Sequence, residues 1–338
     1  MTDKSNNKRI IKQTAKNEKA KPVMASGIPS ASEASYEQVK KEHRFYFNIV
    51  KRRYLWFAIS LLILIPCIIS IIVQGLNFGI DFKGGSLFNI KFDQAVTQEN
   101  ITKALDSAGI SGQVQLSDGN TVALIRTTVL SDEQRTSMIN ALQEGAGTFD
   151  LAKVQEDTVG PAIGAELRRG ALYSLTLATI LILLYITVRF RSVYAFPAVL
   201  GLLHDVVIVI GVFSIFQWQV DAPFIAAILT VFGYSINDTV VIYDRIRENE
   251  RRLKKRDSFE DMVDKSVWQT MGRSIKTSAT VFIALLCIYL LGGESTKVFA
   301  LAMLIGVVVG AYSSIFIVSQ LVVQIKIWLG GDKVKKAA

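Results

Sequence analysis

Two aspartates lie inside stretches of the sequence that are otherwise apolar enough to cross a membrane. Asp238 interrupts FGYSINDTVVIY, and Asp205 interrupts FPAVLGLLHDVVIVIGVF. A carboxylate at the middle of a membrane helix costs about 2.5 to 3.5 kcal/mol on insertion scales, so it normally faces a partner group or a polar path. We therefore expect a functional role for Asp238. Two interpretations of Asp205 are equally consistent with the sequence. It has a functional role, or its carboxylate only packs against polar atoms of adjacent helices.

The start of the next apolar stretch, QTMGRSIKTSATVF, offers Asp238 a counter-charge. Thr270, Arg273, Thr277 and Thr280 recur at helical spacing, so they are predicted to share one helix face. Asp238 lies roughly 7 to 8 Å from the charged end of its own stretch, at 1.5 Å per residue. An arginine side chain can bridge that depth, so the pattern predicts a contact between Arg273 and Asp238.

This pair could couple the passage of protons to conformation. Ser235 and Asn237 are predicted to place polar atoms beside Asp238. A carboxylate whose arginine contact is made in one conformation and broken in another has a different proton affinity in each. Arginine suits the counter-charge because it stays protonated where a lysine could lose its proton. We predict a proton relay of Asp238, Arg273 and Asp205, with Ser235, Asn237 and Thr277 as supporting polar groups.

The composition places these residues in a membrane protein. The chain has 338 residues, 50% of them hydrophobic, and a mean hydropathy of +0.34. A span needs about 20 mostly apolar residues. The windows that qualify predict transmembrane helices at 54–76, 166–190, 196–217, 223–243, 275–292 and 298–325. No small-residue cleavage site follows the first, so it is predicted to be a retained anchor.

The basic residues indicate the orientation. The net charge is +9. Of the 38 lysines and arginines, 13 lie before Tyr54 and 9 between Asp244 and Ser274, whereas the short connections 217–222 and 292–297 contain only Lys297. Because basic loops stay on the cytoplasmic side, both termini of this multi-pass chain are predicted to be cytoplasmic. The charge therefore does not indicate a nucleic-acid partner.

The one long connection, 77–165, is predicted to be an extracytoplasmic domain. Strands at 86–92, 113–116, 122–127 and 151–159 alternate with helices at 98–108 and 132–144. The order β-α-β-β-α-β is the ferredoxin-like arrangement. The fold class is thus a polytopic α-helical membrane protein with an α+β domain between helices 1 and 2.

The remaining segments are predicted to be cytoplasmic. Within the loop 244–274, Asp257 and Glu260 are predicted to cap a short amphipathic helix. The other expected segments are a disordered N-terminus at 1–35, a basic juxtamembrane segment at 36–53 and a tail at 326–338. An enzyme is not expected, because the chain has two histidines, His43 and His204, and no nucleophile motif or metal-ligand spacing. No cofactor is expected beyond protons as the coupling ion.

Three motifs in order carry a family resemblance: GIDFKGG at 79–85, INDTVVIYDRIREN at 236–249 and MGRSIKTSAT at 271–280. With them the chain resembles SecF members of the SecD/SecF family of protein-export membrane proteins, within the resistance-nodulation-division superfamily. That superfamily uses twelve helices in two related halves, so this chain resembles one half. The family's membrane carboxylate matches Asp238 and its arginine matches Arg273, while Asp205 matches a polar position less closely.

The resemblance implies a role in protein export driven by the proton-motive force. The implied partners are SecD, the SecYEG channel, the accessory proteins YajC and YidC, unfolded preprotein on the outer side, and membrane lipids. The family motif after helix 1 comprises Gly79, Asp81, Lys83, Gly84 and Gly85. Two other hypotheses remain open: a proton-coupled exporter of lipids or small molecules from the same superfamily, and a scaffold in which the charged pair only fastens helices.

Overall fold

A computed structural model describes residues 36–42, 46–190, 192–253 and 257–329. The predictions for 1–35 and for most of the C-terminal tail lie outside the described residues. The described part of the first 46 residues forms one unit. It contains helix α2 (Tyr36–Glu42) and Tyr46, and the hydroxyl groups of Tyr36 and Tyr46 form a hydrogen bond. Residues from Phe47 onward form a second unit, which holds the helices and the sheet discussed below.

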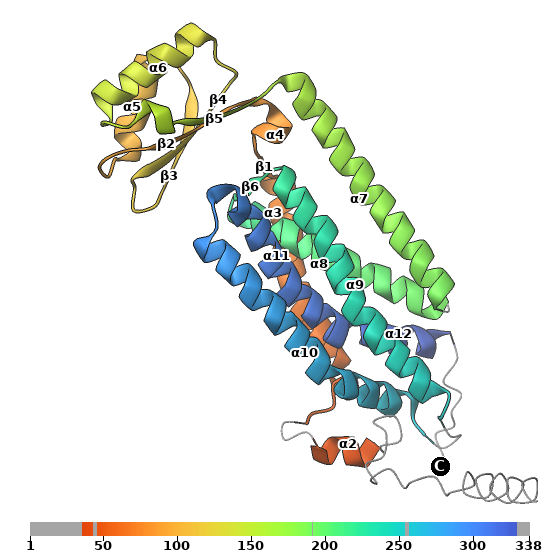
Figure 1. The fold of residues 1–338 in the computed structure, drawn as a ribbon. Coiled ribbons are helices and arrows are strands. Elements are labelled where there is room, and N and C mark those ends of the chain that lie inside the picture. The colour runs from red at the N-terminus through yellow and green to blue at the C-terminus, as the bar shows by residue number, and fades with distance from the viewer. Residues whose placement is uncertain (1–35, 43–45, 191, 254–256, 330–338) are drawn as a thin grey trace, which may run out of the picture. The chain divides into compact units, whose positions relative to one another are not determined.

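The second unit contains an α/β region with its own apolar core (Figure 1). Its elements are β2 (Gly85–Lys91), α5 (Gln98–Ser107), β3 (Gly112–Ser117), β4 (Val122–Thr127), α6 (Asp132–Gly145), η2 (Leu151–Lys153) and β5 (Gln155–Val159). The strands pair antiparallel in the order β3-β4-β2-β5. This is the order expected of a ferredoxin-like region. The predicted strand 151–159 is shorter than expected, because its first residues form the 3₁₀ turn η2.

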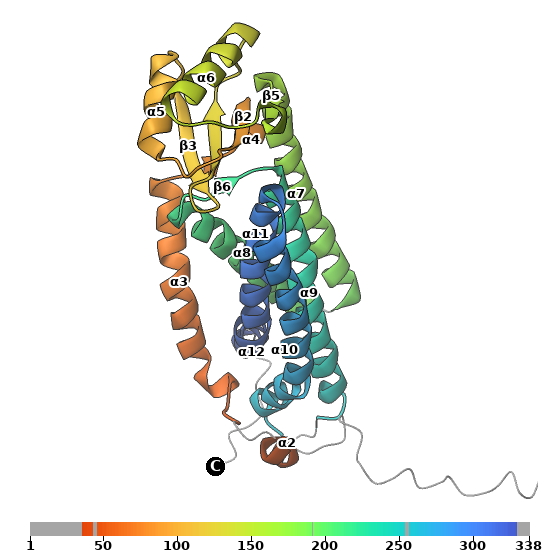
Figure 2. The same ribbon diagram turned by 60° about the vertical axis from the view of Figure 1, so that its left-hand side comes forward.

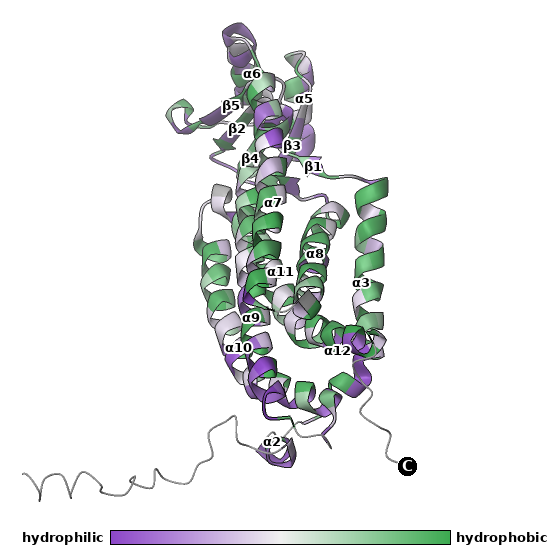
Figure 3. Ribbon diagram, turned by 90° about the vertical axis from the view of Figure 1, so that its right-hand side faces the viewer, coloured by the Kyte–Doolittle hydropathy of each residue, from purple (hydrophilic) through white to green (hydrophobic). Residues whose placement is uncertain are grey.

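Six helices in the described part of the chain are long and apolar enough to cross a membrane. The first five are α3 (Arg53–Val73), α7 (Pro161–Arg189), α8 (Ser192–Ile215), α9 (Ala222–Glu250) and α10 (Phe259–Leu291). The sixth is a continuous run of α11 (Glu294–Ser313), η3 (Ser314–Val318) and α12 (Ser319–Trp328). The 3₁₀ turn η1 (Val50–Arg52) directly precedes α3. Figure 2 shows α3 along one side of this group and α7 along the other. Figure 3 shows that hydrophobic residues dominate the helices and polar residues their ends.

The six helices are not equally buried. The most apolar window of α7 is 6% buried and that of α10 is 11% buried, against 56% for α8 and 61% for the α11–α12 run. The α8 and α11 helices therefore form the centre, together with α9, whose Val231 packs against Gly306. The apolar surfaces of α7 and α10 are left for lipid or for another chain.

The fifth helix differs from the sequence prediction. The amphipathic segment is not a separate helix, because α10 runs unbroken from Phe259 into the apolar stretch. Its N-cap is Ser258, whose side chain accepts a bond from the Asp261 N–H, so the predicted cap at Asp257 was wrong by one residue. Farther along, buried Asp264 accepts bonds from the N–H groups of Ile49 and Val50. This part of α10 thereby anchors the start of α3.

Candidate functional site

The first buried carboxylate, Asp205 on α8, is fully enclosed by hydrogen-bond donors. Its Oδ1 lies 2.9 Å from His204 Nδ1, and its Oδ2 accepts from Ser235 Oγ at 2.6 Å and from Ser313 Oγ at 2.8 Å. His204 Nε2 bonds Ser60 Oγ on α3. A neutral ring with its proton on Nδ1 donates to Asp205 and accepts from Ser60. Asp205 therefore ties together α3, α8, α9 and α11.

Two features of the sixth span allow this approach. Gly310 places its backbone next to Ser235, and an added Cβ there would lie 3.6 Å from Asp205 Oδ2. Small residues such as Gly306 and Gly310 permit this close approach of helices. Directly after Ser313, the helix widens into the π-helical turn η3, an irregularity that often marks functional sites. Polar groups of the sixth span thus reach α8 and α9.

The second buried carboxylate, Asp238 on α9, is much less well satisfied. It is 4% exposed, and its Oδ2 is buried with no hydrogen-bond partner in the described part of the chain. Ser274 of α10 lies beside it, near enough for its hydroxyl to act on the Asp238 carboxylate as a donor, although neither buried oxygen has a hydrogen bond of good geometry among these residues. An unpaired buried polar atom is unfavourable by about 1 to 3 kcal/mol. Asp238 therefore has an unmet capacity to bind a proton or a donor.

The expected ion pair with Arg273 is not formed among the described residues. Arg273 is close enough to Asp238 to act on it electrostatically, but its side chain is exposed. The stripe of α10 that faces α9 instead contains Thr270, Ser274 and Ser278; the last of these accepts a bond from the Tyr234 hydroxyl at 2.9 Å. These three residues recur at i, i+4 and i+8, whereas the predicted stripe ran from Thr270 through i+3, i+7 and i+10. One residue turns a helix by about 100°, so Arg273 lies on the adjoining face.

The three supporting residues are also distributed differently from the prediction. Ser235 lies one turn before Asp238 but donates to Asp205. Asn237 is exposed and makes no side-chain hydrogen bond among the described residues. Thr277 donates to the Arg273 carbonyl of its own helix at 3.0 Å. Only Ser235 is therefore part of a buried polar network, and that network centres on Asp205.

A short series of hydroxyl groups lies between the two carboxylates. Ser314 Oγ bonds both the Ser235 carbonyl, at 3.3 Å, and Thr239 Oγ1, at 2.9 Å. Thr239 directly follows Asp238 in the chain. The Ser313–Ser314 pair therefore contacts the Asp205 network with its first residue and the surroundings of Asp238 with its second.

The family motif forms a junction at the other end of the helices. After the short helix α4 (Ile80–Lys83), Gly84 and Gly85 have φ of +76° and +132°, and an added Cβ on Gly85 would meet the Thr127 carbonyl at 2.4 Å. Glycine adopts such positive φ angles at little cost, so these two residues permit the chain to reverse here. Asp81 Oδ2 accepts from the Ala222 N–H at the start of α9, at 2.8 Å. Lys83 is exposed.

Two further strands strengthen this junction. β1 (Asn77–Phe78), which precedes the motif, pairs in parallel with β6 (Gln219–Val220), which precedes α9. Gly79 permits this approach, because an added Cβ would overlap the Gln219 side chain. The motif therefore fastens the end of α3 to the start of α9.

Charged groups outside the helices surround the same junction. Asp221 caps α9 by accepting from the Phe224 N–H, and burial raises its pKa to about 6, with the Asp81 charge adding to the rise. Arg126 of β4 lies near enough to counter this rise in part, and burial lowers the pKa of Arg126 itself. The junction thus holds a titratable carboxylate beside a cation from the α/β region.

Comparisons with known proteins agree with the motifs. Residues 138–328 match the model for the protein export membrane protein SecD/SecF, C-terminal, and residues 69–96 match the SecD/SecF GG motif. The chain belongs to the SecD/SecF family. The first match covers most of the helices around Asp205 and Asp238, and the second covers the junction motif. Since this is a family of protein-export membrane proteins, the interpretation as a multi-pass membrane transport protein and not an enzyme is confirmed.

SecD/SecF relatives align over most of the chain. A protein translocase subunit SecF from Sebaldella termitidis is 42% identical over 281 residues, which are 81% of this chain and 90% of the relative. The SecF subunit from Haemophilus influenzae is 36% identical over 274 residues, covering 80% of this chain and 83% of the relative. These relatives identify the chain as a SecF-type member of the family.

A solved structure of the family has the same fold. The crystal structure of SecDF, a translocon-associated membrane protein from Thermus thermophilus, superposes with a TM-score of 0.76 at 35% identity. The match covers 83% of this chain and 39% of that SecDF chain, so this chain corresponds to only a part of SecDF. The six spans and the α/β region after the first agree with the predicted fold class.

Sequence reasoning missed several residues of the Asp205 network: Ser60, His204, Thr239, Ser313 and Ser314. Each is a buried polar residue inside an apolar helix. Ser313 and Ser314 could have been found, because two consecutive hydroxyl residues inside an apolar span are a usable signal. His204 could have been found from its position next to Asp205. Ser60 has no comparable signal, because its partner is 144 positions away in the chain.

Proposed function

We propose that this chain acts as the SecF subunit of the Sec protein-export machinery and, together with SecD, uses the proton-motive force to promote preprotein translocation. Family membership supports the assignment to export. The contribution of this chain's own geometry is a buried carboxylate, Asp238, with an oxygen free to accept a proton. Arg273 supplies the nearby positive charge whose distance can change with conformation.

The unpaired oxygen of Asp238 is the observation that carries the proposal. A proton-coupled device needs a group that gains and loses a proton, together with a conformational change that alters its surroundings. Asp205 already accepts three hydrogen bonds within this chain. In contrast, the buried Oδ2 of Asp238 accepts no hydrogen bond among the described residues. We propose that Asp238 titrates and that Asp205 chiefly fastens helices.

We further propose the arrangement in the membrane and the partners. Both termini and the loop before α10 face the cytoplasm, and the α/β region faces outward, in a bacterial plasma membrane. The exposed apolar surface of α7 and α10 supports a second helical half, SecD, as a neighbour. SecYEG and an unfolded preprotein on the outer side follow from the export role. An impermeant thiol reagent should label Asn120→Cys in intact cells and Asp257→Cys only after permeabilisation.

Export into inverted membrane vesicles that contain SecYEG, SecD and this chain tests the proposal. Asp238→Asn and Arg273→Met should insert normally but lose the stimulation of translocation that a proton gradient gives. Lys276→Met, which removes an exposed charge from the same helix, is the matched control and should retain it. Full gradient-dependent export with both Asp238→Asn and Arg273→Met would refute the relay. Activity retained by a charge swap, Asp238→Arg with Arg273→Asp, would favour a structural pair.

A further inference from the structure

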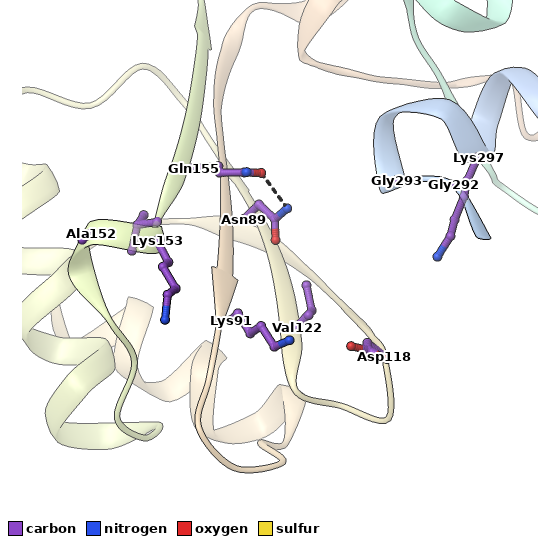
Figure 4. A pocket seen from close by; sticks show the side chains of 11 residues that line it. Asn89, Lys91, Asp118, Val122, Ala152, Lys153, Gln155, Gly292, Gly293 and Lys297 are labelled. Carbon is purple, nitrogen blue, oxygen red and sulfur yellow. Dashed lines mark hydrogen bonds between the residues drawn. The ribbon is translucent and has the colours of Figure 1, made fainter. Parts of the chain in front are cut away.

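The chain enters and leaves the α/β region through two neighbouring strands, β2 and β5. β2 begins at Gly85, directly after α4 and Gly84, and β5 ends at Val159, shortly before α7. The two strands pair antiparallel from Gly85 and Val159 at one end to Asn89 and Gln155 at the other. Asn89 also donates to the Gln155 side chain at 3.2 Å, as Figure 4 shows. The two connections to the membrane helices therefore lie side by side where they leave the sheet.

Beyond the sheet, the two connections touch through glycine backbones. A Cβ added to Gly84 would lie 3.0 Å from the Pro161 Cα. A Cβ added to Gly164, in the first turn of α7, would lie 3.1 Å from the Gly84 nitrogen and 3.2 Å from the Phe82 carbonyl oxygen. We call these two touching segments the neck, residues 82–85 and 159–164. The start of α7 thus rests on the backbone at the end of α4, with little room for a side chain between them.

Helix α7 is held mainly at its two ends. In this helix, all of which the structure describes, the buried residues are Gly164 in the first turn and Ile186 near the last. Pro161 occupies the first helical position, where its fixed φ suits a helix start, so α7 begins within the neck. At the other end, Arg189 forms an ion pair with Asp244 of α9 at 3.0 Å. α7 therefore connects the α/β region to the later turns of α9.

We propose that Gly164 is a positioning residue that makes α7 and the α/β region one rigid body. A contact between backbones contains no side-chain torsion that could absorb a displacement, and closely packed groups pass a displacement on. A movement of α9 at Asp238 that shifts Asp244 therefore reaches the α/β region through α7. The match to the GG motif covers residues 69–96, so Gly164 completes the contact of that motif from outside it. The effect on export rests on the proposed proton coupling, whereas the rigidity of the neck does not.

Distances between spin labels test whether the neck is rigid. The labels are placed at Lys103→Cys on α5 and Tyr173→Cys on α7, both exposed, in the full chain purified with SecD and with its native cysteines changed to serine. We expect one narrow distance distribution in this parent. Gly164→Val should widen or displace the distribution, because the added side chain meets backbone atoms that cannot rotate away. Gly170→Val, at a glycine of the same helix with open space around it, is the matched control and should leave the distribution unchanged.

Export into vesicles that contain SecYEG, SecD and this chain tests the consequence for function. Gly164→Val should lose most of the stimulation that a proton gradient gives, measured against export without a gradient, and Gly170→Val should retain it. Arg189→Gln leaves the neck intact but removes the ion pair with Asp244. This second variant should keep the narrow distance distribution and still lose stimulation, so the test does not depend on how well the Gly164 variant folds.

Three outcomes would overturn the proposal. An unchanged distance distribution in Gly164→Val would show that the neck does not fix α7. Full stimulation in Gly164→Val despite a wider distribution would show that a rigid neck does not serve export. Full stimulation in Arg189→Gln would remove α7 from the connection between α9 and the α/β region. Asp238→Asn should lose stimulation but keep the narrow distribution, so a failure of proton coupling and a failure of the neck give different results.

Discussion

Asp205 and Asp238 are both buried aspartates on neighbouring helices, but their surroundings are opposite. Asp205 accepts bonds from His204, Ser235 and Ser313, all within this chain. Asp238 keeps a buried oxygen without a partner among the described residues and faces the poorly buried helix α10. A fully bonded carboxylate specifies one arrangement of helices, whereas an unsatisfied one favours a change of state. This difference supports our proposal that Asp205 fastens helices and that Asp238 titrates.

The largest expected effect is on stability, and it would separate the two sites directly. Asp205→Ala removes the acceptor of three buried donors, so we expect a loss of about 3 to 5 kcal/mol or a failure to accumulate folded protein. Asp238→Ala removes a carboxylate that lacks such partners, so its cost should stay within about 1 kcal/mol. Thermal unfolding of the protein in detergent measures both. Equal losses would remove the distinction between the sites.

Asp221 is an intermediate case outside the membrane and predicts a pH dependence. It accepts one backbone bond, yet its pKa is raised from 3.8 to about 6. The folded state therefore binds this proton more tightly than the unfolded state, and the free energy of unfolding falls as pH rises between those values. Lowering the pH from about 7 to about 5 should stabilise the protein by about 1 kcal/mol through this group.

Asp221→Asn isolates that contribution, because asparagine keeps the oxygen that caps α9 and loses the charge. The difference in unfolding temperature between parent and variant should be largest near neutral pH and shrink on acidification. Asp81 and Arg126 face the same group, so Asp81→Asn should lower the pKa of Asp221 and move the effect to lower pH. A parent and an Asp221→Asn variant with parallel pH profiles would contradict the assignment.

The sequence predicts those features of the two sites that depend on residues close together in the chain. The burial of Asp238 in a long apolar helix, the six spans and the order of the α/β elements follow from apolar runs and periodicity, which are local. The hydrogen-bond partner of Ser235 could not be predicted in this way. Its i, i+3 spacing from Asp238 on the same helix favoured Asp238, but α8 packs against α9 and Ser235 donates to Asp205 instead. The stripe of α10 that faces α9 was likewise displaced by one residue, from Arg273 to Ser274.

The smallest predicted effect concerns two single hydroxyl groups, one beside each aspartate. Ser313→Ala removes one donor to Asp205 and should cost about 1 kcal/mol. Ser274→Ala removes a hydroxyl that lies beside Asp238 but has no hydrogen bond of good geometry among the described residues, so it should cost less than Ser313→Ala. Both serines lie within apolar helices, which makes them a matched pair. Unfolding temperatures in the same detergent compare them, and a larger loss for Ser274→Ala would reverse the interpretation of the two sites.

Infrared difference spectroscopy of the reconstituted protein during a pH titration tests most directly whether Asp238 is the carboxyl group that titrates. A protonated carboxylic acid in a buried site gives a carbonyl stretching band that a carboxylate lacks. Asp221 is also buried and binds a proton near pH 6, so all variants are compared in an Asp221→Asn background. In that background we predict that the band appears on acidification with Asp205→Asn as it does without it, and is lost with Asp238→Asn. A band that survives in Asp238→Asn and disappears in Asp205→Asn would contradict the account.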